Sequence, residues 1–222
     1  MARIIDSSGS VQSREVIINS TLKNTYLLLA MTLLFSAAMA GLSMAMNWPR
    51  LGMIPTLVGY FGLLFLTSKF SNSGYGILFV FALTGFMGVT LGPIISLYVN
   101  SIPNGSSIVM NAMGGTGLIF VSLSAYAVIT RKDFSFMGGM LMAGILVAFL
   151  LGIGAIFFQM PMLSLAVSGM FILLMSGLIL YETSQIVHGG ETNYINATVT
   201  LFVSIFNLFT SLLHILGIMG DD

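Results

Sequence analysis

The sequence predicts an all-α fold, a polytopic membrane protein built as a bundle of seven transmembrane helices. The first observation behind this prediction is the composition. Hydrophobic residues make up 57% of the chain and charged residues only 6%, whereas soluble domains carry about 25% charged residues. So few charges cannot form the polar surface that a water-soluble protein of this length needs. We therefore expect lipid to be the solvent around most of the molecule.

The second observation is that charges and turn residues divide the apolar sequence into segments of membrane-spanning length, for which roughly 20 apolar residues are needed. Lys23 and Arg50 enclose the first segment, and Arg50 and Lys69 enclose a shorter second one. The uncharged stretch from Lys69 to Arg131 is too long for one helix. It breaks at Asn100–Gly105, which contains Pro and Gly, and so predicts two helices.

The remaining segments follow in the same way. The stretch from Phe134 to Tyr181 breaks at Gln159–Pro161, and a last apolar segment follows the polar sequence that ends near Asn196. We expect one membrane domain over residues 1–222, with a mostly polar and mobile N-terminal tail at 1–24. The predicted helices cover about 25–46, 51–68, 75–99, 107–129, 136–158, 162–181 and 197–219.

The distribution of Lys and Arg predicts the orientation, because cytoplasmic loops are enriched in these residues. If the N-terminus is inside, the outer side carries only Arg50. We therefore predict a cytoplasmic N-terminus, which also places the loop 182–196 on the cytoplasmic side. The cations then on the inner side are Arg3, Arg14, Lys23, Lys69, Arg131 and Lys132.

Several classes of function are disfavoured. The chain has no cysteine and a net charge of zero, which excludes disulfides and thiolate catalysis and argues against nucleic-acid binding. It contains no HExxH, no GxSxG and no pair of intramembrane aspartates. His188 and Glu191 share a loop, but two residues do not make a metal site. We expect no enzyme activity, no cofactor and no metal site.

Small residues recur every four positions in two segments. Gly144, Ala148 and Gly152 do so in the fifth segment, and Gly88 and Gly92 in the third. Small side chains allow helices to approach closely in lipid, so this pattern predicts packing inside the bundle. A face that binds a partner protein is the alternative interpretation.

The last apolar segment carries polar residues along one side. Their spacing of 4, 4, 3, 4 and 3 residues follows one face of a helix. Polar groups facing lipid are costly, so we expect this helix at the centre of the bundle, with the stripe directed toward other helices or water. Hydrogen bonding between helices and a polar conduit both fit the pattern. The stripe consists of Asn196, Thr200, Ser204, Asn207, Ser211 and His214.

Glu182 borders the sixth segment on the predicted cytoplasmic side. Apolar surroundings disfavour the charged form of a carboxyl group, although at this depth the side chain can also reach the interface. Lys69, Arg131 and Lys132 are expected on the same side and are available to pair with it. The candidate functional polar core comprises Glu182, Ser204, Asn207, Ser211 and His214.

The strings LYETSQIVHGGETNY and NLFTSLLHILG near the C-terminus resemble the Bax inhibitor-1 family of seven-helix membrane proteins. The string RKDFSFMGGMLMAG, between the fourth and fifth segments, fits the same family, as do the length, the polar N-terminus and the number of spans. The resemblance covers essentially the whole chain. Within it, GGMLMAG and HGGETNYI are similar to the bacterial YccA branch.

This resemblance implies a protein of the bacterial inner membrane that binds the FtsH membrane protease and modulates its proteolysis of membrane proteins. The N-terminal residues 1–20 are a segment that such a machine could grip. For the wider family, the resemblance implies a pH-sensitive calcium or proton leak, and a last helix that lies in the middle of the other six. The implied partners are thus FtsH and the lipid bilayer, with an ion only under the leak hypothesis.

The chain departs from the wider family at one position. The resemblance ties the leak to two acids, one on helix six and one on helix seven. The first corresponds to Glu182, but the second falls three residues before NLF, where this chain has Ser204. Two acids that share a proton respond to pH through mutual repulsion, and a glutamate beside a serine does not. The departure argues against the calcium leak.

Overall fold

A computed structural model describes the backbone of residues 2–220 and the side chains of residues 15–220, and it confirms an all-α polytopic membrane fold. Seven helices in this range are long and apolar enough to cross a membrane, and the range contains no strand. The short 3₁₀ helix η1 (Ser135–Met137) precedes α5. The seven helices are α1 (Ala2–Ala45), α2 (Met53–Phe70), α3 (Tyr75–Ser101), α4 (Gly105–Thr130), α5 (Gly138–Phe157), α6 (Pro161–His188) and α7 (Tyr194–Met219).

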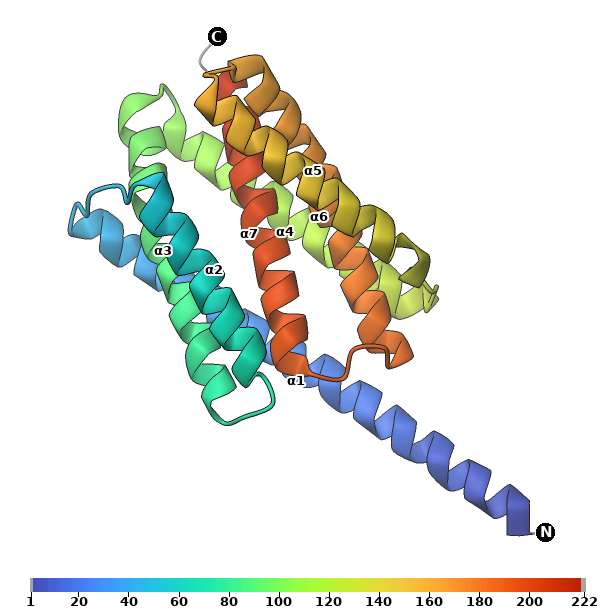
Figure 1. Cartoon of the computed structure of the whole chain (residues 1–222). Helices are drawn as coiled ribbons and strands as arrows, with labels where there is room; N and C mark the ends of the chain where they lie inside the picture. The colour runs from blue at the N-terminus through green and yellow to red at the C-terminus, as the bar shows by residue number, and fades with distance from the viewer. Residues whose placement is uncertain (1, 221–222) are drawn as a thin grey trace.

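Helix α7 lies in the middle of the bundle, as expected (Figure 1). It packs against α1, α2, α3, α4 and α6, whereas α5 lies at the edge, against α6 and η1, and meets α2 through the rings of Phe149 and Phe61. No residue of α7 from Tyr194 to Gly217 is exposed. Polar groups on such a helix do not face lipid, so the row of polar residues on α7 lies inside the membrane without contacting it.

The two ends of the bundle differ in charge. Lys69 ends α2, and Arg131 and Lys132 follow α4, all at the end where α7 begins. We call this the basic end; it lies toward the bottom and right of Figure 1, where the N-terminal part of α1 also projects beyond the other helices. Arg50 lies at the opposite end, between α1 and α2.

The prediction for the first helix was wrong about where it begins. A helix was expected over 25–46 after a polar tail at 1–24, but α1 runs without a break from Ala2 to Ala45. Within the residues whose side chains are described, Glu15–Ala45 of this helix is long and apolar enough to cross a membrane. A search for apolar runs finds the lipid-embedded length of a helix, and polar residues that continue the same helix into water escape it.

The sixth helix also ends later than predicted. It was expected to stop at 181, but α6 continues to His188 and ends where Gly189 adopts a left-handed conformation at φ 73°. Glycine takes this conformation without steric cost and commonly terminates helices. Glu182 therefore lies inside α6, and the predicted loop 182–196 contracts to residues 189–193.

Close packing accounts for both runs of small residues. A Cβ atom on Gly88 would collide with the Ser36 backbone carbonyl of α1, and one on Gly92 would lie 2.7 Å from the Ala40 carbonyl oxygen. On α5, a Cβ atom on Gly144 would lie 2.6 Å from Leu174 of α6. These contacts confirm the interpretation that the small residues serve packing inside the bundle.

Candidate functional site

Glu182 is buried within α6, with 6% of its surface exposed. It lies six residues before the end of the helix, about 9 Å along the helix axis. Within residues 15–220 its carboxyl group forms no hydrogen bond or ion pair. A pairing with Lys69, Arg131 or Lys132, which the sequence left open, is therefore not found. Instead, the Lys69 ammonium lies over the Phe70 ring at 5.9 Å, and the Lys132 ammonium over the Tyr126 ring at 5.7 Å.

Hydroxyl groups of the neighbouring helices lie at the same depth in the bundle as Glu182. The Tyr26 hydroxyl of α1 lies 3.2 Å from the Thr183 hydroxyl of α6. The Thr198 hydroxyl of α7 donates to the Thr25 carbonyl of α1 at 3.2 Å and to its own helix at 2.7 Å. These bonds join α1, α6 and α7 at one depth.

Ser124 of α4 lies at the same depth. The Arg131 carbonyl, at the end of α4, lies 3.0 Å from Nε2 of His188, at the end of α6. Because the two helices run in the same direction, Ser124, two turns earlier, lies about level with Glu182. The hydroxyl oxygens of Ser124 and Thr25 have no hydrogen-bond partner among the described residues. We call the following set the polar layer: Thr25, Tyr26, Ser124, Glu182, Thr183 and Thr198.

Between the polar layer and the basic end, side chains bond to connecting loops. The Ser184 hydroxyl donates to the Lys132 carbonyl at 3.1 Å and accepts from the Phe134 backbone N–H at 3.0 Å. The Asn193 side-chain oxygen accepts from the first backbone N–H groups of α7, and its amide donates to Asn72 at 2.9 Å. Such caps satisfy backbone groups that a helix end leaves free. The α4–α5, α6–α7 and α2–α3 connections are thereby tied to helix ends.

The polar stripe of α7 bonds largely to its own helix. Ser204 is fully buried, and its hydroxyl donates to the Thr200 carbonyl at 2.7 Å. The Thr200 hydroxyl donates to the Asn196 carbonyl at 3.1 Å, and the Asn207 amide to the Val203 carbonyl at 2.8 Å. These groups find acceptors one turn back along α7, so they need neither a partner helix nor water.

The far part of the stripe makes a bond between helices. Nδ1 of His214 lies 2.8 Å from the Ser168 hydroxyl of α6, and Ser211, one turn earlier, is buried. This bond sets the register of the antiparallel pair α6 and α7. In that register Glu182 is about level with Thr200, one turn from Ser204. The residues of the predicted polar core therefore do not form one cluster. They are spread along the length of α7, with Glu182 of α6 beside its first turns and His214 near its end.

The sequence interpretation missed the contribution of α1. Thr25 and Tyr26 belong to the polar layer, yet neither was singled out. A signal was present, because small hydroxyl residues recur on α1 at spacings of 4, 7, 4 and 7 residues, which lie on one helical face. All are buried. This second stripe comprises Thr21, Thr25, Thr32, Ser36 and Ser43.

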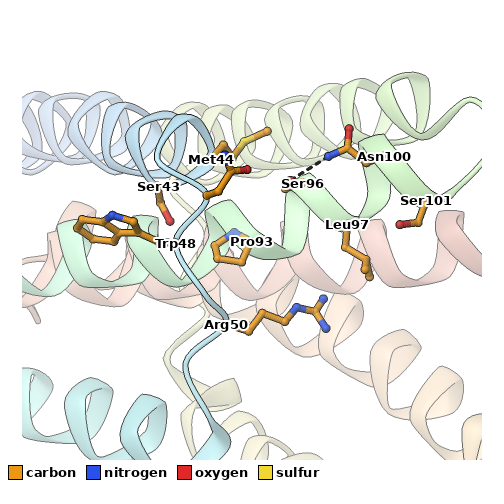
Figure 2. A pocket seen from close by; sticks show the side chains of 10 residues that line it. Ser43, Met44, Trp48, Arg50, Pro93, Ser96, Leu97, Asn100 and Ser101 are labelled. Carbon is orange, nitrogen blue, oxygen red and sulfur yellow. Dashed lines mark hydrogen bonds between the residues drawn. The ribbon is translucent and has the colours of Figure 1, made fainter.

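A polar hollow lies at the end of the bundle opposite the basic end, with a volume of about 310 Å³. Figure 2 shows Trp48, Arg50 and Pro93 around it, and the Asn100 amide bonded to the Ser96 hydroxyl at 3.0 Å. Arg50 is exposed. The hollow therefore offers one cation and several hydrogen-bonding groups near the membrane surface.

Comparisons with known proteins agree with this architecture. A family model described as "Inhibitor of apoptosis-promoting Bax1" matches residues 18–221. The "Modulator of FtsH protease YccA" of Escherichia coli strain K12 is 50% identical over 222 residues, which is 100% of both chains. The "Inner membrane protein YccA" of Escherichia coli O6:H1 shows the same identity and coverage. "Uncharacterized protein PA2604" of Pseudomonas aeruginosa is 49% identical over 97% of this chain and 96% of its own length.

Proposed function

This chain belongs to the Bax inhibitor-1 family, and we propose that it binds the FtsH membrane protease and modulates the proteolysis of membrane proteins. It is a multi-pass protein of the bacterial inner membrane. The proposed role is regulatory, in which the chain acts as a partner of the protease and itself catalyses no reaction.

One observation carries this proposal. The relative named as a modulator of FtsH is 50% identical to this chain over the full length of both. Identity of this extent spans all seven helices and their connections. It therefore supports a shared role for the whole bundle, and not only a shared fold.

The shape of the basic end supports a contact outside the membrane. We propose that this end faces the cytoplasm, because six of the seven Lys and Arg residues fall on that side of the chain. Helix α1 begins at Ala2, and its part Glu15–Ala45 is by itself long and apolar enough to cross a membrane. The backbone between them forms a helix that projects past the bundle (Figure 1), where a protease partner has access to it.

Co-purification with FtsH in detergent tests the proposal. The full-length chain is expected to co-purify with the protease and to change its turnover of a membrane-protein substrate. Deleting residues 2–14 shortens the projecting helix and leaves intact Glu15–Ala45, which is long and apolar enough to cross a membrane. That variant is expected to co-purify less well and to lose most of the effect on turnover.

A matched control separates the projecting helix from general damage to the bundle. A variant with residues 2–14 replaced by an unrelated helix-forming sequence of the same length keeps the length but not the surface. If the full-length chain neither co-purifies with the protease nor alters substrate turnover, the regulatory proposal is wrong. If both helix variants behave like the full-length chain, the contact lies elsewhere on the protein.

A second candidate function, a pH-sensitive calcium or proton leak, is favoured by one observation. Glu182 is buried and has no hydrogen-bond or ion-pair partner in the part of the chain whose side chains are described. Against a leak stand Ser204 in place of a second acid and a stripe whose hydroxyl groups bond to their own helix. The regulatory role is therefore the better supported of the two.

Ion flux into proteoliposomes distinguishes this second candidate. A leak through the polar layer predicts flux that Glu182→Gln reduces, and pH-sensitive flux that Ser204→Asp increases. The regulatory proposal predicts no flux above that of empty liposomes for the unmodified chain. Flux that is present but unchanged by Glu182→Gln would remove that residue from any gating role.

A further inference from the structure

Helices α1 and α4 flank α7 but do not pack against each other. No Cα atom of α1 lies within 8 Å of one in α4 in the described chain, although both helices pack against α7. The rings of Tyr26 of α1 and Phe120 of α4 come together across the gap, with centroids 6.0 Å apart. The gap leaves a groove on the lipid-facing surface that reaches down to the central helix. We call it the α1–α4 groove.

The middle of the groove is apolar and has a volume of about 490 Å³. Its floor comes from α7, through Phe202, Ile205, Phe206 and Phe209, and its walls include Leu33 of α1. No charged residue lines this stretch. None of the polar stripe residues of α7 lines it either, because the stripe lies on the opposite face of that helix. This stretch suits a hydrocarbon chain.

Toward the basic end, the groove continues into a second stretch of about 620 Å³ that shares Phe120 with the first. Asn19 and Lys23 of α1 line it. Ser124 of α4 lines it as well, and its hydroxyl group is one of the two buried ones that lack a partner. This second stretch is still mainly apolar, and Lys23 is the one charged residue that lines it among the described side chains.

At its mouth the groove ends in a smaller space of about 180 Å³, where Arg131 faces Glu15 and Asn19. The charged groups along the groove are thus Lys23, Arg131 and Glu15, with Lys132 next in sequence to Arg131. Cations outnumber the single carboxylate. An anionic group at the membrane surface is favoured here, because each Lys or Arg near the surface contributes about 1 kcal/mol of attraction to anionic lipid.

We infer that the α1–α4 groove is a binding site for an anionic phospholipid. Its phosphate lies at Lys23 and Arg131, and one acyl chain follows the groove past Phe120 onto the aromatic face of α7. The length agrees with this arrangement. From Lys23 to Leu33, the first α1 residue that lines the apolar stretch, is ten residues, about 15 Å of helix. A chain anchored at Lys23 therefore reaches the apolar stretch within about half the thickness of the hydrocarbon core.

The dimensions favour a lipid chain over a transmembrane helix of another protein. A helix with its side chains is about 10–12 Å across, so a helix seated on α7 would have to separate α1 from α4. The apolar stretch has a volume of about 490 Å³, within the range of roughly 300–1,000 Å³ typical of small-ligand sites. The inference does not depend on the protease proposal, and each can fail while the other holds.

Native mass spectrometry of the full-length protein in detergent tests the headgroup site. The probes are phosphatidylglycerol and phosphatidylcholine with identical acyl chains. The protein is expected to retain phosphatidylglycerol in preference. Lys23→Gln and Arg131→Gln are each expected to weaken its retention about fivefold, with little effect on phosphatidylcholine. The matched control is Lys69→Gln, at the same membrane surface but outside the groove, and it should change nothing.

Filling the groove tests the acyl-chain site. A Cβ atom on Gly117 meets nothing within 4 Å, and Gly117 lines the apolar stretch, so Gly117→Leu occupies the groove without a collision. The matched control is Gly114→Leu, which adds the same side chain on α4 at a position equally open but outside the lining. Gly117→Leu is expected to lose the retained phospholipid, and Gly114→Leu to keep it.

Several results would overturn the inference. These are equal retention of the two lipids, insensitivity to both charge variants, and equal behaviour of the two glycine variants. A photoreactive phenylalanine analogue in place of Gly117, irradiated in native membranes, adds an independent readout. Cross-linking to phospholipid supports the site, whereas cross-linking to another protein chain would show that a partner helix occupies the groove.

Discussion

The two sides of helix α7 differ in how their side chains are satisfied. On one side the polar stripe is packed against other helices, and Ser204 is fully buried, with its hydroxyl group bonded to the Thr200 carbonyl of its own helix. On the other side, Phe206 and its aromatic neighbours line the α1–α4 groove, which opens to lipid. The polar side has little space around it, and the side with space is apolar. A path for ions needs polar groups and space at the same place, and here the two are separated.

This difference also explains why a central helix can carry so many polar residues. A serine or threonine in a helix donates back to a carbonyl one turn earlier, so its hydroxyl is satisfied before any neighbour is considered. Thr200, Ser204 and Thr210 all do this. The stripe is then compatible with tight packing against α6, and polarity by itself does not identify a conduit.

The largest expected effect comes from adding volume to the packed side. Ser204→Leu places a large side chain where no space exists, and overpacking of this kind costs about 1–3 kcal/mol. The corresponding change on the open side, Gly117→Leu, is expected to stay within about 0.5 kcal/mol. Unfolding of the purified protein by a denaturing detergent measures both. Equal destabilisation by the two variants would show that the two sides do not differ in packing.

The next effect concerns the one bond that joins the stripe to another helix. A double-mutant cycle with Ser168→Ala and His214→Phe is expected to give a coupling of about 0.6 kcal/mol, the average for hydrogen bonds between membrane helices, and at most about 1.7 kcal/mol. Pairing Ser168→Ala with Thr200→Val serves as the control, because these residues are distant and their effects should add. A coupling near zero for the first pair would contradict the bond between Ser168 and His214.

A smaller effect is expected where a hydroxyl bonds only within its own helix. Ser204→Ala should lower the free energy of unfolding by less than about 0.5 kcal/mol. Thr198→Val is the comparison, since the Thr198 hydroxyl also reaches the Thr25 carbonyl of α1, and a larger loss is expected. The same unfolding measurement applies. A cost for Ser204→Ala above that for Thr198→Val would show that the stripe depends on contacts beyond its own helix.

The smallest effect is expected outside the membrane. The backbone N–H of Ser135 donates to the Asp133 carboxylate at 2.8 Å and holds the pKa of that carboxyl below its usual value. Because its pKa is lower in the folded state, Asp133 contributes stability above its unfolded pKa of about 3.9. That contribution is lost as the pH falls through the folded pKa.

Asp133→Asn should therefore reduce stability slightly at neutral pH, and the difference from the unmodified protein should vanish in acid. Thermal unfolding in detergent between about pH 3 and 7 measures this convergence. A difference that grew as the pH fell would contradict the sign of the pKa shift.

Much of the architecture was predictable because charges and helix-breaking residues mark where chains leave a membrane. Lys69 falls at the end of α2, and Pro103 and Asn104 separate α3 from α4. The spacing of the α7 stripe predicted a central helix, since only that position keeps every polar group from lipid. The start of α1 and the end of α6 were not predictable in this way, because there a polar sequence continues a helix beyond its apolar run.

The candidate site was predictable in part. Glu182 and the α7 stripe stand out in the sequence, but their partners on α1 and α4 depend on which helices meet at one depth. The groove had no sequence signal, since Leu33, Phe206 and Gly117 look like ordinary packing or lipid-facing residues. A groove arises from two helices that fail to meet, and that is a property of the assembled bundle.

Proteoliposomes that contain FtsH, a membrane-protein substrate and this chain test the central claim most directly. Substrate degradation and ion flux are measured in the same preparation, with and without the chain. We expect the chain to alter the rate of degradation while ion flux stays at the level of liposomes that lack it. An unchanged rate of degradation together with a new ion flux would contradict the account.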